Sequence, residues 1–321
     1  MNAIAERYRR FAREEAAGRS GAYESLAKWV AESSVALAFL DRHPPERQQP
    51  NLLFAALRHV AGTPLSAKEL DHAIDAHAEA IAEVMNARTT QTNEPGRCAA
   101  LLPALARIEG PLALIEVGAS AGLCLLPDAY GYDWGASKLA PPAWSRAIAP
   151  VFLCRASENT PLPVRHPEIV WRAGLDLNPL NVSNDEDVAW LETLVWPEHQ
   201  ERLAHLRQAI GIARVECPRV VAGDLRRDLP ALIAEAPGDA TLVVFHTAVL
   251  SYVGDPGERD AFADRMINDP KVIWLSNESP RTFPRIAEIA RPVYEDMFLM
   301  AVDGQPLAWT GPHGQEVRWC E

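Results

Sequence analysis

The chain has 321 residues, of which 48% are hydrophobic and 23% charged, and its formal net charge is −12. This length and composition are typical of a soluble globular protein with one large domain or two smaller ones. The negative charge disfavours a general nucleic-acid-binding surface, because phosphate groups are bound by basic surfaces.

The cysteines and the apolar runs predict the cellular compartment of the protein. The five cysteines are scattered and form no Cys-x-x-Cys pair, which indicates reduced thiols. No apolar run reaches the ~18 residues of a membrane span, and the N-terminus is not a signal peptide. We therefore expect a cytoplasmic protein without a membrane partner, and the sequence leaves its oligomeric state open.

Residues 1–108 are predicted to form a helical bundle or cap. Apolar residues recur at helical spacing over 23–40, 51–60 and 70–85, and Ser66 with Glu69 forms a capping box ahead of the last of these. No metal-ligand spacing and no nucleophile–base pair occurs in this region. We interpret it as structural.

A polar cluster follows these helices. Asn93 can cap the next helix, and Pro95 is tolerated in a first helical turn. Gln91, Glu94 and Arg97 are not explained in that way. Two interpretations stay open, namely a polar loop with one cap, or the edge of a lid on the substrate side of a ligand site.

The most informative stretch comes next. Residues 112–115 are apolar and predict a buried strand, with Glu116 at its carboxyl end. Gly118 and Gly122 then bracket a tight turn, and 121–126 is expected to begin a helix. A strand, a small-residue turn and a helix start present backbone N–H groups to a nucleotide-like ligand in α/β sheets.

The spacing of this turn favours one ligand family over another. Glu116-x-Gly118-x-Ser120-x-Gly122 resembles the first motif of class I S-adenosylmethionine-dependent methyltransferases, acid-x-Gly-x-Gly-x-Gly, with Ser120 in place of the middle glycine. A dinucleotide fingerprint fits less well, because Ser120 and Leu123 occupy two of its three glycine positions. A turn of this kind that binds no cofactor is the alternative interpretation.

An insertion is expected after the turn. Residues 130–168 are rich in Pro and small polar types, and 151–154 with 169–171 are predicted to pair as a small hairpin. The strand over 169–177 then ends at Asp176, and in methyltransferases the acid at this point holds the ribose hydroxyls. Asp133 is the alternative acid, because Asp176 lies unusually far along the chain from Glu116.

Three further strands are predicted over 219–222, 241–246 and 271–275. The methyltransferase pattern gives Asp224, after the first of these, the role of reading the adenine amino group, and a turn-opening acid is the alternative. His246 ends the second and could remove a proton from a methyl acceptor near neutral pH, with Tyr252 orienting that acceptor. A structural strand-end histidine is the competing interpretation.

The C-terminal residues 297–302 and 307–309 are predicted to form an antiparallel hairpin through Asp303-Gly304, followed by a strand over 317–319. From residue 112 onward this order of elements resembles a class I methyltransferase domain. Five runs are similar to an uncharacterised bacterial family, the domain-of-unknown-function family 2332: Gln91-Thr-Asn-Glu, Ile115-Glu-Val-Gly-Ala-Ser-Ala-Gly, Gly174-Leu-Asp-Leu-Asn-Pro, Leu194-Val-Trp-Pro-Glu and Pro312-His-Gly. The resemblance implies a methyltransferase-like fold and brings no known substrate.

The expected architecture is α/β, with a methyltransferase-like (Rossmann-like) doubly wound sheet and a C-terminal hairpin over 109–321, preceded by the helical domain over 1–108. The expected function is S-adenosylmethionine-dependent methyl transfer to a small molecule. The alternative is a catalytically silent ligand-binding or regulatory protein, and a nucleotide-binding hydrolase is disfavoured because no Walker A loop occurs. The candidate residues are Glu116, Gly118, Ser120, Gly122, Asp176 and Asp224 for S-adenosylmethionine, His246 and Tyr252 for catalysis, and Gln91, Asn93, Glu94 and Arg97 on the substrate side, with no metal site.

Overall fold

A computed structural model describes residues 2–91, 93–294 and 296–320. The chain divides into two compact units. The helical unit comprises Met1–Thr92 and Asp185–Ala204, and the α/β unit comprises Asn93–Asn184 and His205–Glu321. The division therefore falls before residue 108, and a later segment of the chain returns to the helical unit.

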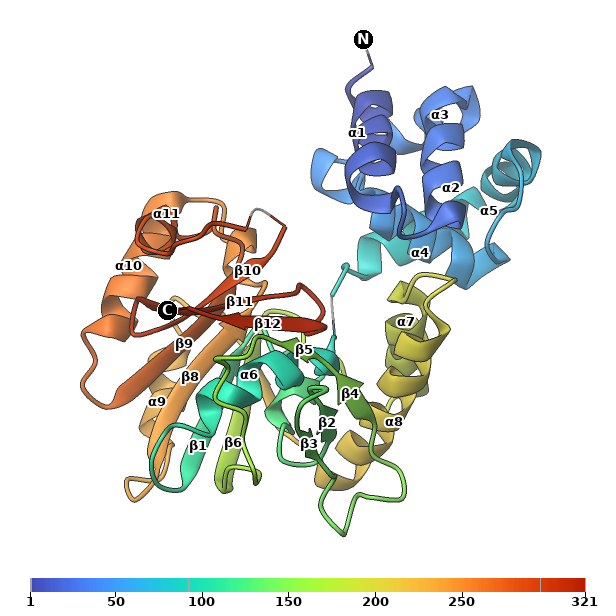
Figure 1. Cartoon of the computed structure of the whole chain (residues 1–321). Helices are drawn as coiled ribbons and strands as arrows, with labels where there is room; N and C mark the ends of the chain where they lie inside the picture. The colour runs from blue at the N-terminus through green and yellow to red at the C-terminus, as the bar shows by residue number, and fades with distance from the viewer. Residues whose placement is uncertain (1, 92, 295, 321) are drawn as a thin grey trace. The chain divides into compact units, whose positions relative to one another are not determined.

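The helical unit contains α1 (Ala3–Phe11), η1 (Ala12–Ala16), α2 (Gly21–Glu32), α3 (Ser34–Leu40), η2 (Pro45–Arg47), α4 (Pro50–Ala61), α5 (Ala67–Ala87), α7 (Asp185–Leu194) and the start of α8 (Gln200–Glu216) (Figure 1). Two helices replace the single one expected over 23–40, because the Ser33 side chain accepts a hydrogen bond from Ala36 N and starts α3 afresh. Ser66 caps α5 as expected, with Glu69 N 3.2 Å from its hydroxyl. The Glu69 carboxylate binds Leu65 N instead of completing the capping box.

The α/β unit is built on a nine-stranded sheet, counted over the described residues, in the order β5-β12-β11-β10-β9-β8-β1-β6-β7. Its strands are β1 (Leu112–Val117), β5 (Arg155–Ala156), β6 (Ile169–Asp176), β7 (Arg219–Ala222), β8 (Thr241–Thr247), β9 (Val272–Glu278), β10 (Phe298–Val302), β11 (Gln305–Thr310) and β12 (Glu316–Trp319). Its helices are η3 (Pro95–Arg97), α6 (Cys98–Leu105), η4 (Leu123–Leu125), α9 (Leu229–Ala234), η5 (Leu250–Tyr252), α10 (Pro256–Ile267) and α11 (Pro284–Ala287), with the rest of α8.

The strands β7-β6-β1-β8-β9 are parallel, and the chain order reverses between β1 and β8. In open α/β sheets this reversal marks the crevice, outside the carboxyl ends of the strands, where ligands bind. The expected C-terminal hairpin is confirmed: β10 and β11 pair antiparallel through Asp303 and Gly304, whose φ angles are 49° and 76°. β12 adds a further antiparallel strand, so the sheet is mixed.

Two local expectations are wrong. β4 (Val151–Leu153) pairs in parallel with β2 (Gly131–Asp133), which in turn pairs with β3 (Lys138–Leu139), so the predicted hairpin between 151–154 and 169–171 does not form. No α-helix follows the glycine turn in the described chain, because residues 123–125 make only a short 3₁₀ turn. The apolar run after the turn is buried in a compact loop instead, with Leu123, Cys124 and Leu125 all buried.

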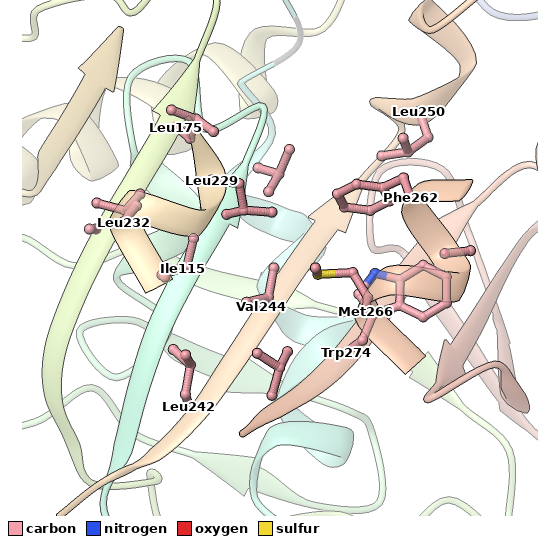
Figure 2. Packing of buried hydrophobic residues seen from close by; sticks show 14 of the residues in the cluster. Ile115, Leu175, Leu229, Leu232, Leu242, Val244, Leu250, Phe262, Met266 and Trp274 are labelled. Carbon is pink, nitrogen blue, oxygen red and sulfur yellow. The ribbon is translucent and has the colours of Figure 1, made fainter. Parts of the chain in front are cut away.

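The two faces of the sheet carry different layers. Apolar side chains of one face pack with α9 and α10, and Figure 2 shows Ile115 of β1, Val244 of β8 and Trp274 of β9 near Leu232 of α9 and Phe262 of α10. α6, buried along its whole length, lies on the other face (Figure 1). Among the described residues, no helix combines the length and the apolar character that crossing a membrane requires.

Candidate functional site

Polar side chains occupy the carboxyl ends of the central strands, on both faces. Because side chains alternate along a strand, Glu116 and Asp176 point to the face that carries α6. His246 and Glu278 have the same parity as Val244 and Trp274, and they point to the face of α9 and α10. The crevice expected at the carboxyl ends is thus bordered by two separate polar clusters.

The turn after β1 has an unusual backbone. Gly118, Ser120 and Gly122 have φ angles of 73°, 50° and 72°, all in the left-handed region. Glycine adopts this region without strain, whereas a residue with a Cβ loses roughly 1–2 kcal/mol there. Ser120 therefore stands where the chain geometry favours glycine, as in the motif that the turn resembles.

Two side chains from elsewhere hold this turn. Asp176 accepts a hydrogen bond from Ser120 N at 2.8 Å with one carboxylate oxygen and from Asn178 N at 2.8 Å with the other. The Asn93 amide accepts from Ala121 N at 3.0 Å and donates to the Ser120 hydroxyl at 2.5 Å. Asn93 therefore does not cap the next helix, as its sequence position suggested, but fixes the turn.

Glu94 and Arg97 are buried beside the same strand ends. Arg97 donates to Thr247 O at 3.0 Å and to Pro312 O at 2.8 Å. Glu94 caps η3 through Gly96 N, and its other oxygen lies 3.5 Å from His313 Nδ1. The side chains of Glu94 and Arg97 are both buried, and the lid-edge interpretation of this cluster stays a prediction. Gln91 belongs to the helical unit instead, and Thr92, in the quoted run, lies outside the described residues.

Glu116 is the most buried acid of the α6-side cluster. Its side chain is 4% exposed, and its Oε2 has no hydrogen-bond partner among the residues that the structure describes. Burial raises the pKa of this carboxyl well above its ordinary value, and the nearby Cys124 thiol and Asp176 add to the effect. A protonated Glu116 can donate as well as accept a hydrogen bond at the end of β1.

The glycines of the turn are packed against the chain itself. A Cβ placed on Gly118 would lie 2.3 Å from a methyl carbon of Val249, and one on Gly122 would lie 3.0 Å from Val220. The absence of a side chain is thus used first for packing within the unit.

The topology distinguishes the two candidate second-strand acids. Asp176 ends β6, which is hydrogen-bonded to β1 along its length. Asp133 belongs to the separate three-stranded sheet, where Lys138 lies 2.7 Å from its carboxylate and, with Gly135 N, lowers its pKa. Only Asp176 of this pair lies next to the Glu116–Gly122 turn.

Asp224 follows β7, as expected, and its carboxylate already has a cationic partner. Arg226 donates to it from the backbone and from the guanidinium, and this pairing lowers the pKa of Asp224 to about 2. Arg226 also binds Glu258 at 2.8 Å. This arrangement is that of a turn-opening acid, which was the alternative interpretation.

His246 is fully buried, and both of its ring nitrogens have partners. Nδ1 lies 2.7 Å from Glu278 Oε1, and Nε2 lies 3.0 Å from the indole nitrogen of Trp274. This geometry favours the structural interpretation of His246 over the role of a general base. Tyr252 lies in η5 and is 70% exposed, whereas His246 is fully buried.

Sequence reasoning did not select Glu278 or Trp274. The signal for Glu278 was available, since an acid follows the predicted fifth strand by a few residues, as Asp176 ends the second. No motif marks it, and β9 extends three residues further than the apolar run that predicted it. In the described residues, no group of three or more His, Cys, Asp and Glu side chains is placed to hold a metal ion.

The chain belongs to a bacterial family described as "Uncharacterized protein conserved in bacteria (DUF2332)", whose pattern matches residues 5–319. No curated protein and no solved structure matches the chain. The family assignment agrees with the resemblance seen in the sequence and adds no activity. The function is therefore argued from the site.

Proposed function

We propose that the α/β unit binds S-adenosylmethionine at the Glu116–Gly122 turn and is a methyltransferase for a small-molecule acceptor. The cofactor would supply an electrophilic methyl group on its sulfonium sulfur. A direct displacement at that methyl group depends mainly on positioning, so the contribution of the chain would be to hold and orient both reactants.

One observation carries this proposal: Asp176 ends the strand beside β1, and its carboxylate touches the turn through Ser120 N. A carboxylate at that place suits a cis-diol, because its two oxygens can accept from two hydroxyls. Glu116 adds a second acceptor, since its buried Oε2 has no donor within the described chain. Glu116 ends β1, which borders the reversal of strand order where open α/β sheets bind their ligands, and Asp176 ends the neighbouring strand β6.

A second candidate function is a ligand-binding protein without turnover. The observation that favours it is Val249, whose side chain fills the space that a Cβ on Gly118 would take, so Gly118 has a packing role that needs no ligand. His246 supports the same alternative, because neither ring nitrogen is available to an acceptor in this arrangement.

Isothermal titration calorimetry with S-adenosylmethionine, S-adenosylhomocysteine, NAD and ATP tests the proposal. We expect binding of the first two ligands only, and Asp176→Asn should weaken it by about 10- to 100-fold, the range for hydrogen bonds to a charged group. Asp133→Asn is the matched control and should bind as the wild type does. Loss of binding in Asp133→Asn alone, or no binding of S-adenosylmethionine at all, would refute the assignment.

Turnover is measured separately. Methyl-labelled S-adenosylmethionine is incubated with sets of small amines, alcohols and carboxylic acids, and label transfer is followed. Binding with transfer to one set supports the enzyme, whereas binding without transfer to any set supports the silent alternative.

A further inference from the structure

The C-terminal loop over residues 311–314, which contains the Pro312-His-Gly run, is held against the segment just before α6. Arg97 Nε donates to Pro312 O at 2.8 Å, a contact between residues 215 positions apart. Gly314 has a φ of 78°, and a Cβ placed on it would overlap Gly96 O, so the two backbones approach as closely as glycine allows. The loop is thus fixed by its main chain at two points.

This contact lies at the crevice that the strand order predicts. β1 and β8 border the reversal of strand order, outside whose carboxyl ends open α/β sheets bind ligands. Arg97 Nη1 donates to the carbonyl of Thr247, the last residue of β8, at 3.0 Å. Asn93, at the other end of the same segment, bonds to the turn after β1. The segment 93–97 therefore connects the ends of the two strands, and the 311–314 loop is packed on it.

The loop presents His313 beside a buried acid. His313 Nδ1 lies 3.5 Å from Glu94 Oε2, and the His313 side chain is 44% exposed, whereas that of Glu94 is 9% exposed. The other oxygen of Glu94 accepts from Gly96 N at 3.2 Å, which fixes the carboxyl group. Because Arg97 and the glycine contact already hold the loop, this pairing is not needed for that purpose. It places a solvent-accessible imidazole next to a carboxylate at the crevice.

We propose that His313 is the catalytic base of the methyl transfer proposed above, with Glu94 as its positioning residue, and this inference rests on that proposed function. His246 cannot take this role in the observed arrangement, because both of its ring nitrogens are bonded within the core. A neutral imidazole can accept a proton near neutral pH. The ring then becomes positively charged, and the adjacent Glu94 carboxylate stabilises that charge.

The role of a base defines the class of acceptor. The hydroxyl or ammonium proton of the acceptor moves to His313 Nε2, and the electron pair left on the oxygen or nitrogen forms the bond to the methyl carbon. The bond between that carbon and sulfur breaks, and its electron pair stays on sulfur, which loses its positive charge. A carboxylic acid is already ionised at neutral pH and needs no base. We therefore expect small alcohols, phenols or amines as acceptors.

The first test is chemical modification read by mass spectrometry, and it needs no turnover. Diethylpyrocarbonate modifies accessible neutral histidines, and His313 is compared with His72, which is exposed in α5, on the same wild-type chain. We expect S-adenosylhomocysteine to slow the modification of His313 and to leave that of His72 unchanged. Calorimetry on the same sample measures whether S-adenosylhomocysteine binds. Binding without protection of His313 would overturn this inference alone, whereas absence of binding would overturn the proposed function with it.

The second test follows label transfer from methyl-labelled S-adenosylmethionine to sets of alcohols, phenols and amines. His313→Ala should lower kcat by roughly 10²–10⁴-fold, the usual contribution of a general base, and leave the Kd of S-adenosylmethionine nearly unchanged. Added imidazole should restore part of the rate, which a structural histidine would not allow. Glu94→Gln keeps an acceptor for Gly96 N and should lower kcat less, with little change in KM. His72→Ala is the matched control and should behave as the wild type does.

Four results of the second test would overturn the proposal. These are transfer by His313→Ala at the wild-type rate, a loss of rate that imidazole does not restore, transfer by the wild type to carboxylic acids alone, and no transfer by the wild type to any acceptor. In the last case, calorimetric binding of S-adenosylmethionine would still leave the proposed cofactor site in place.

Discussion

Two turns of the α/β unit follow the same plan. Gly118 after β1 donates its N–H to Leu175 O at 2.7 Å, and Ala248 after β8 donates to Asn277 O at 3.0 Å. In each case the acceptor is the next-to-last residue of the neighbouring strand. The last residue of that strand is an acid, Asp176 or Glu278, whose carboxylate accepts from the following backbone N–H groups. Each turn then enters a short 3₁₀ segment.

The two turns differ in how the acid distributes its hydrogen bonds between its two carboxylate oxygens. Asp176 gives one oxygen to each of two backbone groups, whereas Glu278 gathers three donors on one oxygen and leaves the other without a donor. In both turns, the acid that ends the neighbouring strand stabilises the turn by accepting hydrogen bonds from its backbone N–H groups. In the turn after β1 this acid also ends the strand beside the glycine turn, and the proposed cofactor site rests on that placement.

The largest expected effect comes from removing the acid of the second turn. Glu278→Ala would leave Val249 N, Leu250 N and His246 Nδ1 without an acceptor in the core, which should destabilise the protein by about 3–5 kcal/mol. Asp176→Ala should cost only about 1–2 kcal/mol, because Asp176 and Asn178 are partly or fully exposed. Urea unfolding of both variants measures this. Equal losses would mean that the two acids hold their turns to the same extent.

The next largest effect is expected at the contact between the two turns, where Gly118 lies against Val249. Gly118→Ala places a Cβ at a φ of 73° and against Val249, and we expect a loss of about 2–4 kcal/mol from backbone strain and overpacking together. Adding Val249→Ala to the same chain should recover the stability that Gly118→Ala loses through overpacking, because it removes the methyl groups that the new Cβ would meet. The double-mutant cycle measures this coupling. Additive effects would show that Val249 does not press on Gly118.

Glu116 allows a test by pH. In the unfolded chain a glutamate ionises near its ordinary pKa of about 4.3, whereas burial raises the pKa of Glu116 well above that value in the folded protein. Above about pH 4.3 the folded protein therefore keeps Glu116 protonated while the unfolded chain loses that proton. The free energy of unfolding then falls as the pH rises toward the folded pKa, by at most about 1.4 kcal/mol per pH unit.

Glu116→Gln should remove this slope. Unfolding free energies of the variant and the wild type, measured between about pH 5 and 8, should converge toward low pH and diverge toward high pH, with the wild type losing more. Glu316→Gln, at a partly exposed and ion-paired acid, serves as the control and should keep the slope. Parallel profiles for Glu116→Gln and the wild type would contradict a raised pKa at this position.

The sequence predicted those parts of the fold that local signals determine. The strand before Gly118, the position of Asp176 at the end of the next strand and the Asp303-Gly304 hairpin all follow from apolar runs and turn residues. The Asn93 contact and the face on which His246 lies do not. Asn93 bonds to Ser120 across 27 positions of chain, and propensity at Asn93 gives only its local capping option.

Pairing explains the remaining errors. The segment 151–154 has the composition of a hairpin strand, but β4 forms a parallel pair with β2. Tertiary packing, which local composition does not encode, determines this pairing. His246 and Glu116 were assigned to one site because both end central strands. Alternation along β1 and β8 places them on opposite faces. No sequence motif contains Glu278, and its structural role is visible only in the three hydrogen bonds that it accepts.

The smallest expected effect concerns the left-handed residues themselves. Ala248 and Ser120 have φ angles of 57° and 50°, so each carries the cost of a Cβ in that region. Ala248→Gly removes this strain and adds some entropy to the unfolded chain, and we expect a net stabilisation of about 0.5 kcal/mol. Ser120→Gly relieves similar strain but also loses the hydroxyl that Asn93 binds at 2.5 Å, so its net effect should be close to zero. Thermal unfolding measures both variants. A stabilised Ser120→Gly would mean that the Asn93 bond contributes little to holding the turn after β1, while a destabilised Ala248→Gly would show that the turn after β8 is not strained at that residue.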